Sequence, residues 1–287
     1  MTSSSEQIIT RFAPSPTGSL HLGHIYAALF ARDLAAKHGG IFLLRFEDID
    51  TTRVREHFYT ETEQDLKWLG IEWSGTPLRQ TSRFPVYLEA LEKLKDRGVV
   101  YPCFCTRKDI QRELANITRA PHGPDGPLYP RTCKKLSPEE VTAKISQGLE
   151  PSWRFDAQRA KQLTGDLTFQ DSQLGEVSVD HGLLGDLVLA RKDIGTSYHI
   201  AVVVDDAFQH ITDVSRGKDL LESTHLHRIL QVLLELPEPR YHHHDLVCDD
   251  SGERLAKRNA ALSIISLREQ GITPEEVTKL TEKGLAE

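Results

Sequence analysis

The amino-acid sequence predicts an α/β fold built on a doubly wound parallel sheet, with an insertion in its middle and a short helical part at its C-terminal end. Three observations predict this fold. Strand-like and helix-like patterns alternate over about the first 100 residues. Residues 120–127, rich in proline and glycine, then interrupt the alternation, because they suit the interior of neither a helix nor a strand. The alternation returns at Gly185, and strands that alternate with helices form parallel sheets with right-handed crossovers.

The first half contains the clearest elements. Residues 7–13 read as a short buried strand that ends at Pro14, because proline cannot donate to a strand ladder. Apolar residues then recur at helical spacing from Leu22 to Leu34, and the glycines after His38 end that helix. The same reasoning predicts a strand at 41–46, helices at 54–69 and 84–97, and a strand at 99–101.

The second half is less regular. The pattern degrades between Cys103 and Gly175, which predicts an insertion. Regular segments are expected again at 185–190, 198–206, 211–214 and 219–235, and Thr273 and Pro274 begin a last helix. We therefore expect four units: the first half of the sheet domain at 1–102, the insertion at 103–184, the second half at 185–240, and a short C-terminal part with a basic loop at 241–287.

The composition excludes several classes of protein. The chain of 287 residues is 39% hydrophobic and 27% charged, and it holds no apolar run near the ~20 residues that cross a bilayer. Its N-terminus lacks the basic and apolar regions of a signal peptide, and four cysteines do not make a disulfide scaffold. A membrane protein, a small secreted protein and a disordered chain are therefore excluded, and we expect a cytoplasmic protein.

Charge is distributed unevenly along the chain. The net charge of −7 argues against a protein that coats nucleic acid by bulk attraction. Residues 101–135 reverse the sign, with seven lysines and arginines against three acidic residues, a local charge of +4. This stretch is either a solvated surface or a face that grips nucleic-acid phosphates, and charge alone does not separate the two.

The strongest local signal is the sequence from Pro14 to His24, which follows a strand and opens a helix. A helix N-terminus offers unpaired N–H groups and positive potential, which suit a phosphate. His21 and His24 lie three residues apart and so share one face of the first turn, where they can stabilise charge that develops on a phosphate under attack. Gly23 leaves room for a flat base against the backbone. The plain alternative is a pair of capping or surface histidines.

A second basic signal lies more than 200 residues downstream, at Arg254-Leu-Ala-Lys-Arg258. Lys257 could follow the phosphates during transfer. Together with His21-Leu-Gly-His24, this segment resembles the two signatures of the class I aminoacyl-tRNA synthetases, although Ala256 stands where the family usually has serine. The resemblance implies a Rossmann-like catalytic domain and makes His21, Gly23, His24 and Lys257 the ATP-binding residues.

Neighbouring charges narrow the resemblance to the glutamyl-tRNA synthetase subgroup, which the segments Arg11–Gly18 and Leu44–Asp50 resemble. Arg11 and Arg216 can each fork onto a carboxylate of a dicarboxylic amino acid. Glu47 can hold its ammonium group, and Tyr198 can close the pocket. Each arginine could instead make a structural salt bridge. The resemblance implies these glutamate-binding residues: Arg11, Phe12, Ala13, Pro14, Ser15, Glu47, Tyr198 and Arg216.

Three cysteines, Cys103, Cys105 and Cys133, predict one structural Zn²⁺ that holds the irregular insertion together. The residues alone leave the fourth ligand open. Imidazole is the commoner zinc donor, which favours His122, whereas the resemblance to the family favours Tyr129. Residues 241–244, Tyr-His-His-His, are not expected to bind metal, because alternate histidines on a strand point to opposite faces.

Only 29 residues follow Arg258, too few for the anticodon-binding domain that a complete glutamyl-tRNA synthetase carries there. We therefore expect no such domain. In this the chain resembles the glutamyl-queuosine tRNA(Asp) synthetases. That resemblance implies ATP with Mg²⁺, L-glutamate and queuosine-bearing tRNA(Asp) as substrates, with no membrane and no obligate protein partner. The alternatives are a glutamyl enzyme that acts on the 3′ end of tRNA(Glu), and an unrelated His-x-Gly-His nucleotidyltransferase.

Overall fold

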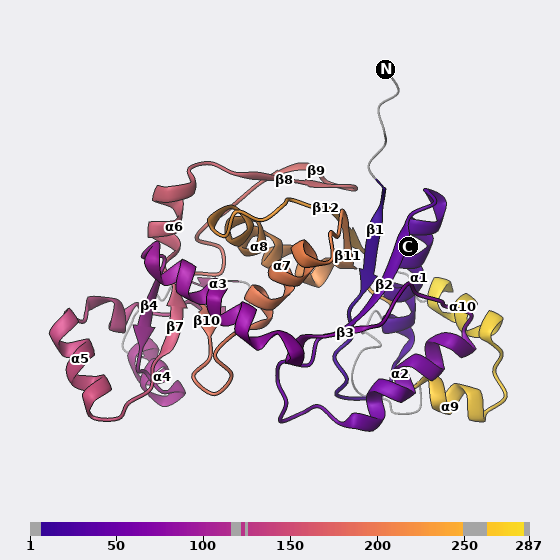
Figure 1. Cartoon of the computed structure of the whole chain (residues 1–287), viewed down its shortest axis with the longest axis horizontal. Helices are drawn as coiled ribbons and strands as arrows, with labels where there is room; N and C mark the ends of the chain where they lie inside the picture. The colour runs from indigo at the N-terminus through magenta and orange to yellow at the C-terminus, as the bar shows by residue number, and fades with distance from the viewer. Residues whose placement is uncertain (1–6, 116–121, 124–125, 249–262, 284–287) are drawn as a thin grey trace, which may run out of the picture.

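We describe the protein from a computed structural model, which places residues 7–115, 122–123, 126–248 and 263–283 (Figure 1). Helices and strands follow one another along this chain. The helices are α1 (Leu22–Lys37), α2 (Glu56–Trp68), α3 (Phe84–Asp96), α4 (Arg107–Ala115), α5 (Pro138–Ser146), α6 (Ala157–Thr164), α7 (Tyr198–Phe208), α8 (Leu221–Leu233), α9 (Ile264–Glu269) and α10 (Pro274–Lys283). The strands are β1 (Ile9–Phe12), β2 (Ile41–Phe46), β3 (Leu78–Arg79), β4 (Val100–Cys103), β5 (His122–Gly123), β6 (Gly126–Pro127), β7 (Ser152–Phe155), β8 (Thr168–Asp171), β9 (Gly175–Ser178), β10 (Val188–Ala190), β11 (Asp213–Gly217) and β12 (Arg240–His244). Short 3₁₀ turns lie at η1 (Gln80–Arg83), η2 (Thr132–Lys135) and η3 (Lys218–Leu220).

The main sheet is parallel at its centre. Strand β2 pairs with β1 and β3, and β12 pairs with β11 and β8, all in parallel, while β9 is an antiparallel edge strand on β8. The two halves meet at β1 and β11, where the N–H of Thr212 donates to the carbonyl of Ile9 at 3.0 Å. This contact sets the edge of the three-stranded group β3-β2-β1 beside the edge of the four-stranded group β11-β12-β8-β9, so that the strands follow one another in the order β3-β2-β1-β11-β12-β8-β9. This order confirms the predicted doubly wound parallel sheet.

The strand order reverses between β1 and β11. From β1 the chain passes through α1 to β2 on one side, and from β11 it passes through α8 to β12 on the other. Open α/β sheets bind their ligands at such a switch point, outside the carboxyl ends of the strands. The residues that end β1 and β11, Arg11 and Arg216 among them, lie at this point.

Helices cover both faces of the sheet. Along β2, Phe42 and Leu44 join the hydrophobic core that α1, α2, α9 and α10 complete, whereas Leu43 packs against a second core formed with α3, α7 and α8. Alternate residues of a strand point to opposite faces, so one strand serves both cores. Within the described residues, helices are too short or too polar to span a bilayer.

The sheet membership of two predicted strands differs from the expectation. The strands expected near 99–101 and 185–190 form as β4 and β10, but both pair antiparallel with β7 in a separate sheet. Conversely, β8 and β9 lie within residues 103–184 and yet extend the main sheet. Strand pairing therefore crosses both predicted boundaries of the insertion, because pairing depends on distant partners and not on local pattern.

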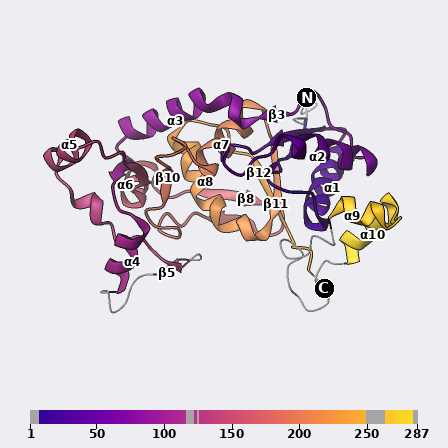
Figure 2. The same ribbon diagram turned by 90° about the horizontal axis from the view of Figure 1, so that it is seen from below.

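The separate sheet and the C-terminal helices lie at opposite ends of the molecule (Figures 1 and 2). Helices α4 and α5 lie with β4, β7 and β10 at one end, and α9 and α10 lie beside α1 and α2 at the other. The last helix begins as predicted: the N–H of Glu276 donates to Thr273 Oγ1 at 3.3 Å, and Glu276 accepts from the Thr273 N–H at 2.8 Å. This capping box satisfies two N–H groups at the start of α10.

Candidate active site and candidate zinc centre

The two histidines of the His-Leu-Gly-His segment lie together at the start of α1. His21 is the N-cap residue, and its backbone N–H donates to His24 Nδ1 at 3.4 Å. The two rings stack, with 3.7 Å between their centroids. A Cβ atom at Gly23 would lie 3.3 Å from the His21 ring, which is a tight contact. Glycine avoids this contact and so allows the ring to take its observed position. Two imidazoles therefore lie at the positive end of a helix, where they can meet a phosphate.

Lys257 lies outside the described residues, but the chain that follows it returns to the histidines. Ser263, six positions further along the sequence, forms an isolated antiparallel bridge with His21. The N–H of Ile264 donates to the carbonyl of Leu20 at 3.0 Å. Described backbone contacts therefore connect the start of α1 with the part of the chain that begins at Ser263, five residues after the second signature ends.

Arg11 lies at the end of β1 in a buried cluster of four charges. Its Nε donates to Asp206 Oδ1 at 2.9 Å, and Arg45 Nη1 donates to the same oxygen at 2.8 Å. Arg45 Nη2 also reaches Glu47 Oε1 at 3.3 Å. Burial would raise the pKa of Asp206, but the two guanidinium groups outweigh it and lower that pKa, whereas burial dominates at Glu47 and raises its pKa.

This cluster bears on two of the glutamate-binding predictions. Arg11 was expected to fork onto a substrate carboxylate, and it already has an internal carboxylate partner in Asp206. Glu47, predicted to hold the ammonium group, is oriented by Arg45 and by its own N–H, which donates to the carbonyl of Pro14 at 3.0 Å. Sequence reasoning assigned no role to Arg45, although it lies two residues before Glu47 and is fully buried.

The other predicted residues of the Arg11–Ser15 segment lie around the end of β1. Phe12 is buried in the hydrophobic core, so its side chain faces away from solvent, and Ser15 is exposed. Ala13 is half-buried. Phe12 can therefore contribute its backbone, but not its side chain, to a binding site. The glutamate-binding role of residues 11–15 stays a prediction.

Arg216 differs from the other buried arginines in its partners. Its side chain is 6% exposed, and within the described residues it makes no ion pair with a carboxylate. Its guanidinium donates to His227 Nδ1 at 2.9 Å, to Thr224 Oγ1 at 2.6 Å and to Tyr198 Oη at 3.5 Å. All of these acceptors are neutral groups. A buried cation without a countercharge is costly, so its environment favours binding of an anion.

Three histidines near Arg216 are kept neutral. Burial, reinforced by Arg216, lowers the pKa of His199 and of His243 to about 4, and it lowers the pKa of His227 well below its usual value. His242, His243 and His244 follow one another on β12 and make separate contacts, with Asp213, Asp171 and the Asp245 carbonyl.

The neutral histidines predict how stability depends on pH. Their pKa values are lower in the folded protein than the ordinary 6.5, so the unfolded chain binds more protons between pH 6.5 and 4. Stability is therefore complete above pH 6.5 and falls as the pH drops toward 4, by about 2 kcal/mol at pH 5 for His199 and by the same amount for His243. Thermal melting at pH 7 and pH 5 measures this. His199→Gln should weaken the pH dependence and the exposed His38→Gln should keep it, while a level melting temperature in the wild type would contradict the prediction.

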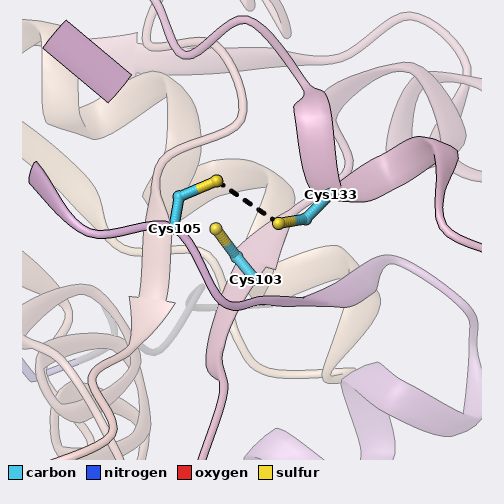
Figure 3. Close-up of side chains that lie close together, drawn as sticks. All are labelled: Cys103, Cys105 and Cys133. Atoms are coloured by element: carbon cyan, nitrogen blue, oxygen red, sulfur yellow. Dashed lines mark hydrogen bonds between the residues drawn. The ribbon is translucent and has the colours of Figure 1, made fainter. Parts of the chain in front are cut away.

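The three predicted zinc-binding cysteines converge, as Figure 3 shows. The Sγ atoms of Cys103, Cys105 and Cys133 lie within 4.8 Å of one another, with 3.4 Å between Cys105 and Cys133. Tyr129 joins them: its Oη lies 3.4 Å from the sulfurs of both Cys103 and Cys105. Tetrahedral Zn²⁺ with bonds of about 2.3 Å places sulfurs about 3.8 Å apart, so the donor set fits this ion. The side chain of His122, the alternative fourth ligand, lies outside the described residues.

Arg154 supports the cysteine cluster. Its Nε donates to Cys103 Sγ at 3.2 Å, and its guanidinium stacks on the Tyr129 ring at 3.7 Å. Burial opposes ionisation of Cys103, but its hydrogen bonds with Tyr129 and Arg154 outweigh burial and lower the pKa of this thiol. A cation beside the cluster stabilises the thiolate that a metal requires. Sequence reasoning did not find Arg154, because it lies 51 residues from Cys103 on a neighbouring strand.

Cys103→Ser is expected to release a structural zinc ion and to loosen the antiparallel sheet, because Cys103 ends β4 and one of three thiolates is lost. Elemental analysis measures the metal content, and a melting experiment measures the stability. Cys248→Ser is the matched control, because Cys248 is not part of the cluster. Equal zinc contents in the Cys103→Ser variant and the wild type would remove the zinc assignment.

The basic stretch 101–135 is partly paired internally. Arg131 forms an ion pair with Asp186 at 3.0 Å, and Lys134 forms one with Asp156 at 2.7 Å. The cations Arg107, Lys108 and Lys135 are exposed and have no ion-pair partner within the described chain. The local excess of positive charge is thus displayed by α4 and the end of η2.

Comparison with known proteins identifies the family. Residues 7–284 match the model of a protein family described as "tRNA synthetases class I (E and Q), catalytic domain". The chain is 44% identical to the "Glutamyl-Q tRNA(Asp) synthetase" of Rhodobacter capsulatus, over 95% of this chain and 99% of that protein. It is 40% identical to a protein of the same name from Symbiobacterium thermophilum, over 93% of this chain and 83% of that protein.

A solved structure agrees with this result. The glutamate tRNA ligase of Elizabethkingia meningosepticum, solved in complex with its amino acid, superposes with a TM-score of 0.72 at 27% identity. The match covers 93% of this chain and 53% of that one, so the chain spans about half the length of that ligase. With a family match over almost all of its length, the chain belongs to the class I tRNA synthetases of the E and Q group, an enzyme family of ligases in which it resembles the glutamyl-Q tRNA(Asp) synthetases.

Proposed function

We propose that the protein activates L-glutamate with ATP and transfers it to the queuosine base in the anticodon loop of tRNA(Asp). The observation that carries the choice of amino acid is Arg216, a buried guanidinium whose described partners are all neutral. Such a group is suited to the side-chain carboxylate of glutamate, which it can bind with two parallel hydrogen bonds. The choice of tRNA is supported by the names of the relatives from Rhodobacter capsulatus and Symbiobacterium thermophilum.

The first step is adenylate formation. The α-carboxylate of glutamate attacks the α-phosphorus of ATP, the bond to the β-phosphate oxygen breaks, and pyrophosphate leaves. Negative charge grows on the phosphate oxygens during this step, and His21 and His24 at the positive end of α1 stabilise it. Lys257 is assigned the same role through the sequence resemblance. Mg²⁺ accompanies ATP and neutralises charge on its phosphates.

The second step transfers the glutamyl group. One hydroxyl of the cyclopentene diol of queuosine attacks the glutamyl carbonyl carbon, and AMP leaves. This cis-diol mimics the terminal ribose diol that a conventional synthetase acylates, so the same chemistry serves both. We assign the contacts with tRNA phosphates to exposed cations of the basic stretch 101–135, such as Arg107, Lys108 and Lys135.

The decisive experiment follows labelled glutamate into tRNA. Purified tRNA(Asp) with queuosine should be labelled in the presence of ATP, whereas tRNA(Asp) that lacks the modification should not. Removing the 3′-terminal adenosine should leave labelling intact, because the acceptor is in the anticodon loop. Labelling of tRNA(Glu) that disappears with its 3′-terminal adenosine would instead establish the alternative, a glutamyl enzyme acting on the acceptor end. No glutamate-dependent ATP–pyrophosphate exchange at all would overturn both.

A further inference from the structure

Three of the neutral hydrogen-bond acceptors around Arg216 come from two different elements. His227 and Thr224 lie on α8, one turn apart, and His243 lies on the neighbouring strand β12. His243 Nε2 lies 2.9 Å from Thr224 Oγ1 and 3.4 Å from Arg216 Nε. All three are almost fully buried, with exposures of 0% for Thr224, 1% for His227 and 4% for His243.

The donors and acceptors in this set fix the proton positions. Arginine can only donate, so His227 Nδ1 must be unprotonated, and the proton of this neutral ring must lie on Nε2. From there it is donated to His199 Nδ1 at 3.0 Å. On the other side Asp171 accepts from His243 Nδ1 at 2.7 Å, which leaves His243 Nε2 as an acceptor for the Thr224 hydroxyl. The two histidines that flank Arg216 thus have opposite tautomers.

We infer that Thr224, His227 and His243 are positioning residues that fix the Arg216 guanidinium for an anionic substrate group. The inference rests on the proposed function, because it assigns that group to the side-chain carboxylate of glutamate. Acceptors without charge orient the guanidinium and leave its positive charge uncompensated. A carboxylate in their place would hold it equally well but would neutralise it, as Asp206 does for Arg11 and Arg45.

Asp171 is a carboxylate of this network that contacts His243 and not Arg216 itself. It contacts His243, and its other oxygen accepts backbone N–H groups of Gln173 and Leu174 at 2.9 Å each. Burial opposes its ionisation, but these hydrogen bonds and His243 outweigh burial and lower its pKa, so it stays an acceptor. The titratable side chains that face Arg216 directly are His227, His243 and the hydroxyl of Tyr198, with the ring of Tyr241 stacked at 5.3 Å.

Glutamate-dependent ATP–pyrophosphate exchange tests this network. Thr224→Val removes the hydroxyl but keeps the shape, and His227→Leu removes the ring acceptor. Each should raise the KM for glutamate roughly 10- to 100-fold, the effect of a lost hydrogen bond to a charged group, with kcat and the KM for ATP little changed. Thr224→Ser, which keeps the hydroxyl, should restore the KM. His225→Leu is the control on the same helix, because His225 bonds to the Asp180 N–H and not to Arg216.

The tautomers of His227 and His243 can be measured in the wild-type protein, so this second test does not depend on how well a variant folds. In ¹⁵N-labelled wild-type protein, long-range ¹H–¹⁵N spectra should show a neutral Nε2–H tautomer for His227 and a neutral Nδ1–H tautomer for His243. Identical tautomers, or a protonated ring at neutral pH, would overturn the inference.

The kinetic outcomes separate this inference from the proposed function. A wild-type enzyme without glutamate-dependent exchange refutes the proposed function. An active wild type with an unchanged KM for glutamate in folded Thr224→Val and His227→Leu refutes the positioning role alone. Equal rises in the KM values for glutamate and ATP would indicate general structural damage and would also refute it.

Discussion

Replacing His24 by alanine is expected to slow glutamate-dependent ATP–pyrophosphate exchange by roughly 10²- to 10³-fold, with the KM for glutamate nearly unchanged. His24 stacks on His21 in the first turn of α1, where the helix end adds positive potential. In the proposed role, its contribution grows as charge develops on the α-phosphate and is small in the ground state. A loss confined to the transition state lowers kcat and kcat/KM together.

The matched control for this substitution is His38→Ala. His38 is exposed at the opposite end of the same helix and should leave the exchange rate as it is. If His24→Ala instead raised the KM for glutamate at constant kcat, His24 would belong to the amino-acid pocket, and its assignment to the phosphates would be wrong.

Arg216→Leu is expected to lower kcat/KM for glutamate by roughly 30- to 3,000-fold, the range for removing one partner of a buried charge pair. The loss should be much smaller for glutamine, because its amide carries no charge, so the preference for glutamate should collapse. Arg216→Lys keeps the charge but loses the fork that binds a carboxylate, and it should fall between the two. Competition between the two amino acids in the exchange assay measures the preference.

The control for Arg216→Leu is Arg228→Leu. Arg228 lies on α8 and pairs with Glu238 at 2.7 Å, away from the network around Arg216. This change should leave the preference for glutamate intact. Retained discrimination in Arg216→Leu would show that the side-chain carboxylate is read by another group.

The sequence predicted the helices and the central strands because their signals are local. The spacing of apolar residues from Leu22 onward, and the glycines after His38, define α1 within a few residues. The sheet to which β4 and β10 belong was not predictable, because their pairing with β7 depends on residues about 35 to 55 positions away. Local pattern fixes what an element is, and tertiary contacts decide which sheet it joins.

The residues of the candidate site also fall into those that local sequence predicts and those that only tertiary contacts reveal. Cysteines with recognisable spacing and a His-x-Gly-His segment indicate their chemistry by residue type. Cys103, Cys105 and Cys133 were therefore predicted as one group from the sequence, and their sulfur atoms lie close together in the structure. The partners that give the arginines their roles were not found. Asp206 lies 195 residues from Arg11, and nothing in the sequence around Thr224 or His227 marks them as acceptors for Arg216.

The bridge between His21 and Ser263 has a consequence for shortened versions of the chain. Ile264 and Val277 are fully buried in the same core as Leu22 and Ile25 of α1. A protein that lacks the residues from Ser263 onward would lose α9 and α10, which would expose that core to solvent and remove the backbone contact to His21. The two helices therefore support the start of α1, where the two histidines lie. Proteolysis before Ser263 should therefore abolish turnover even though the histidines themselves survive the cut.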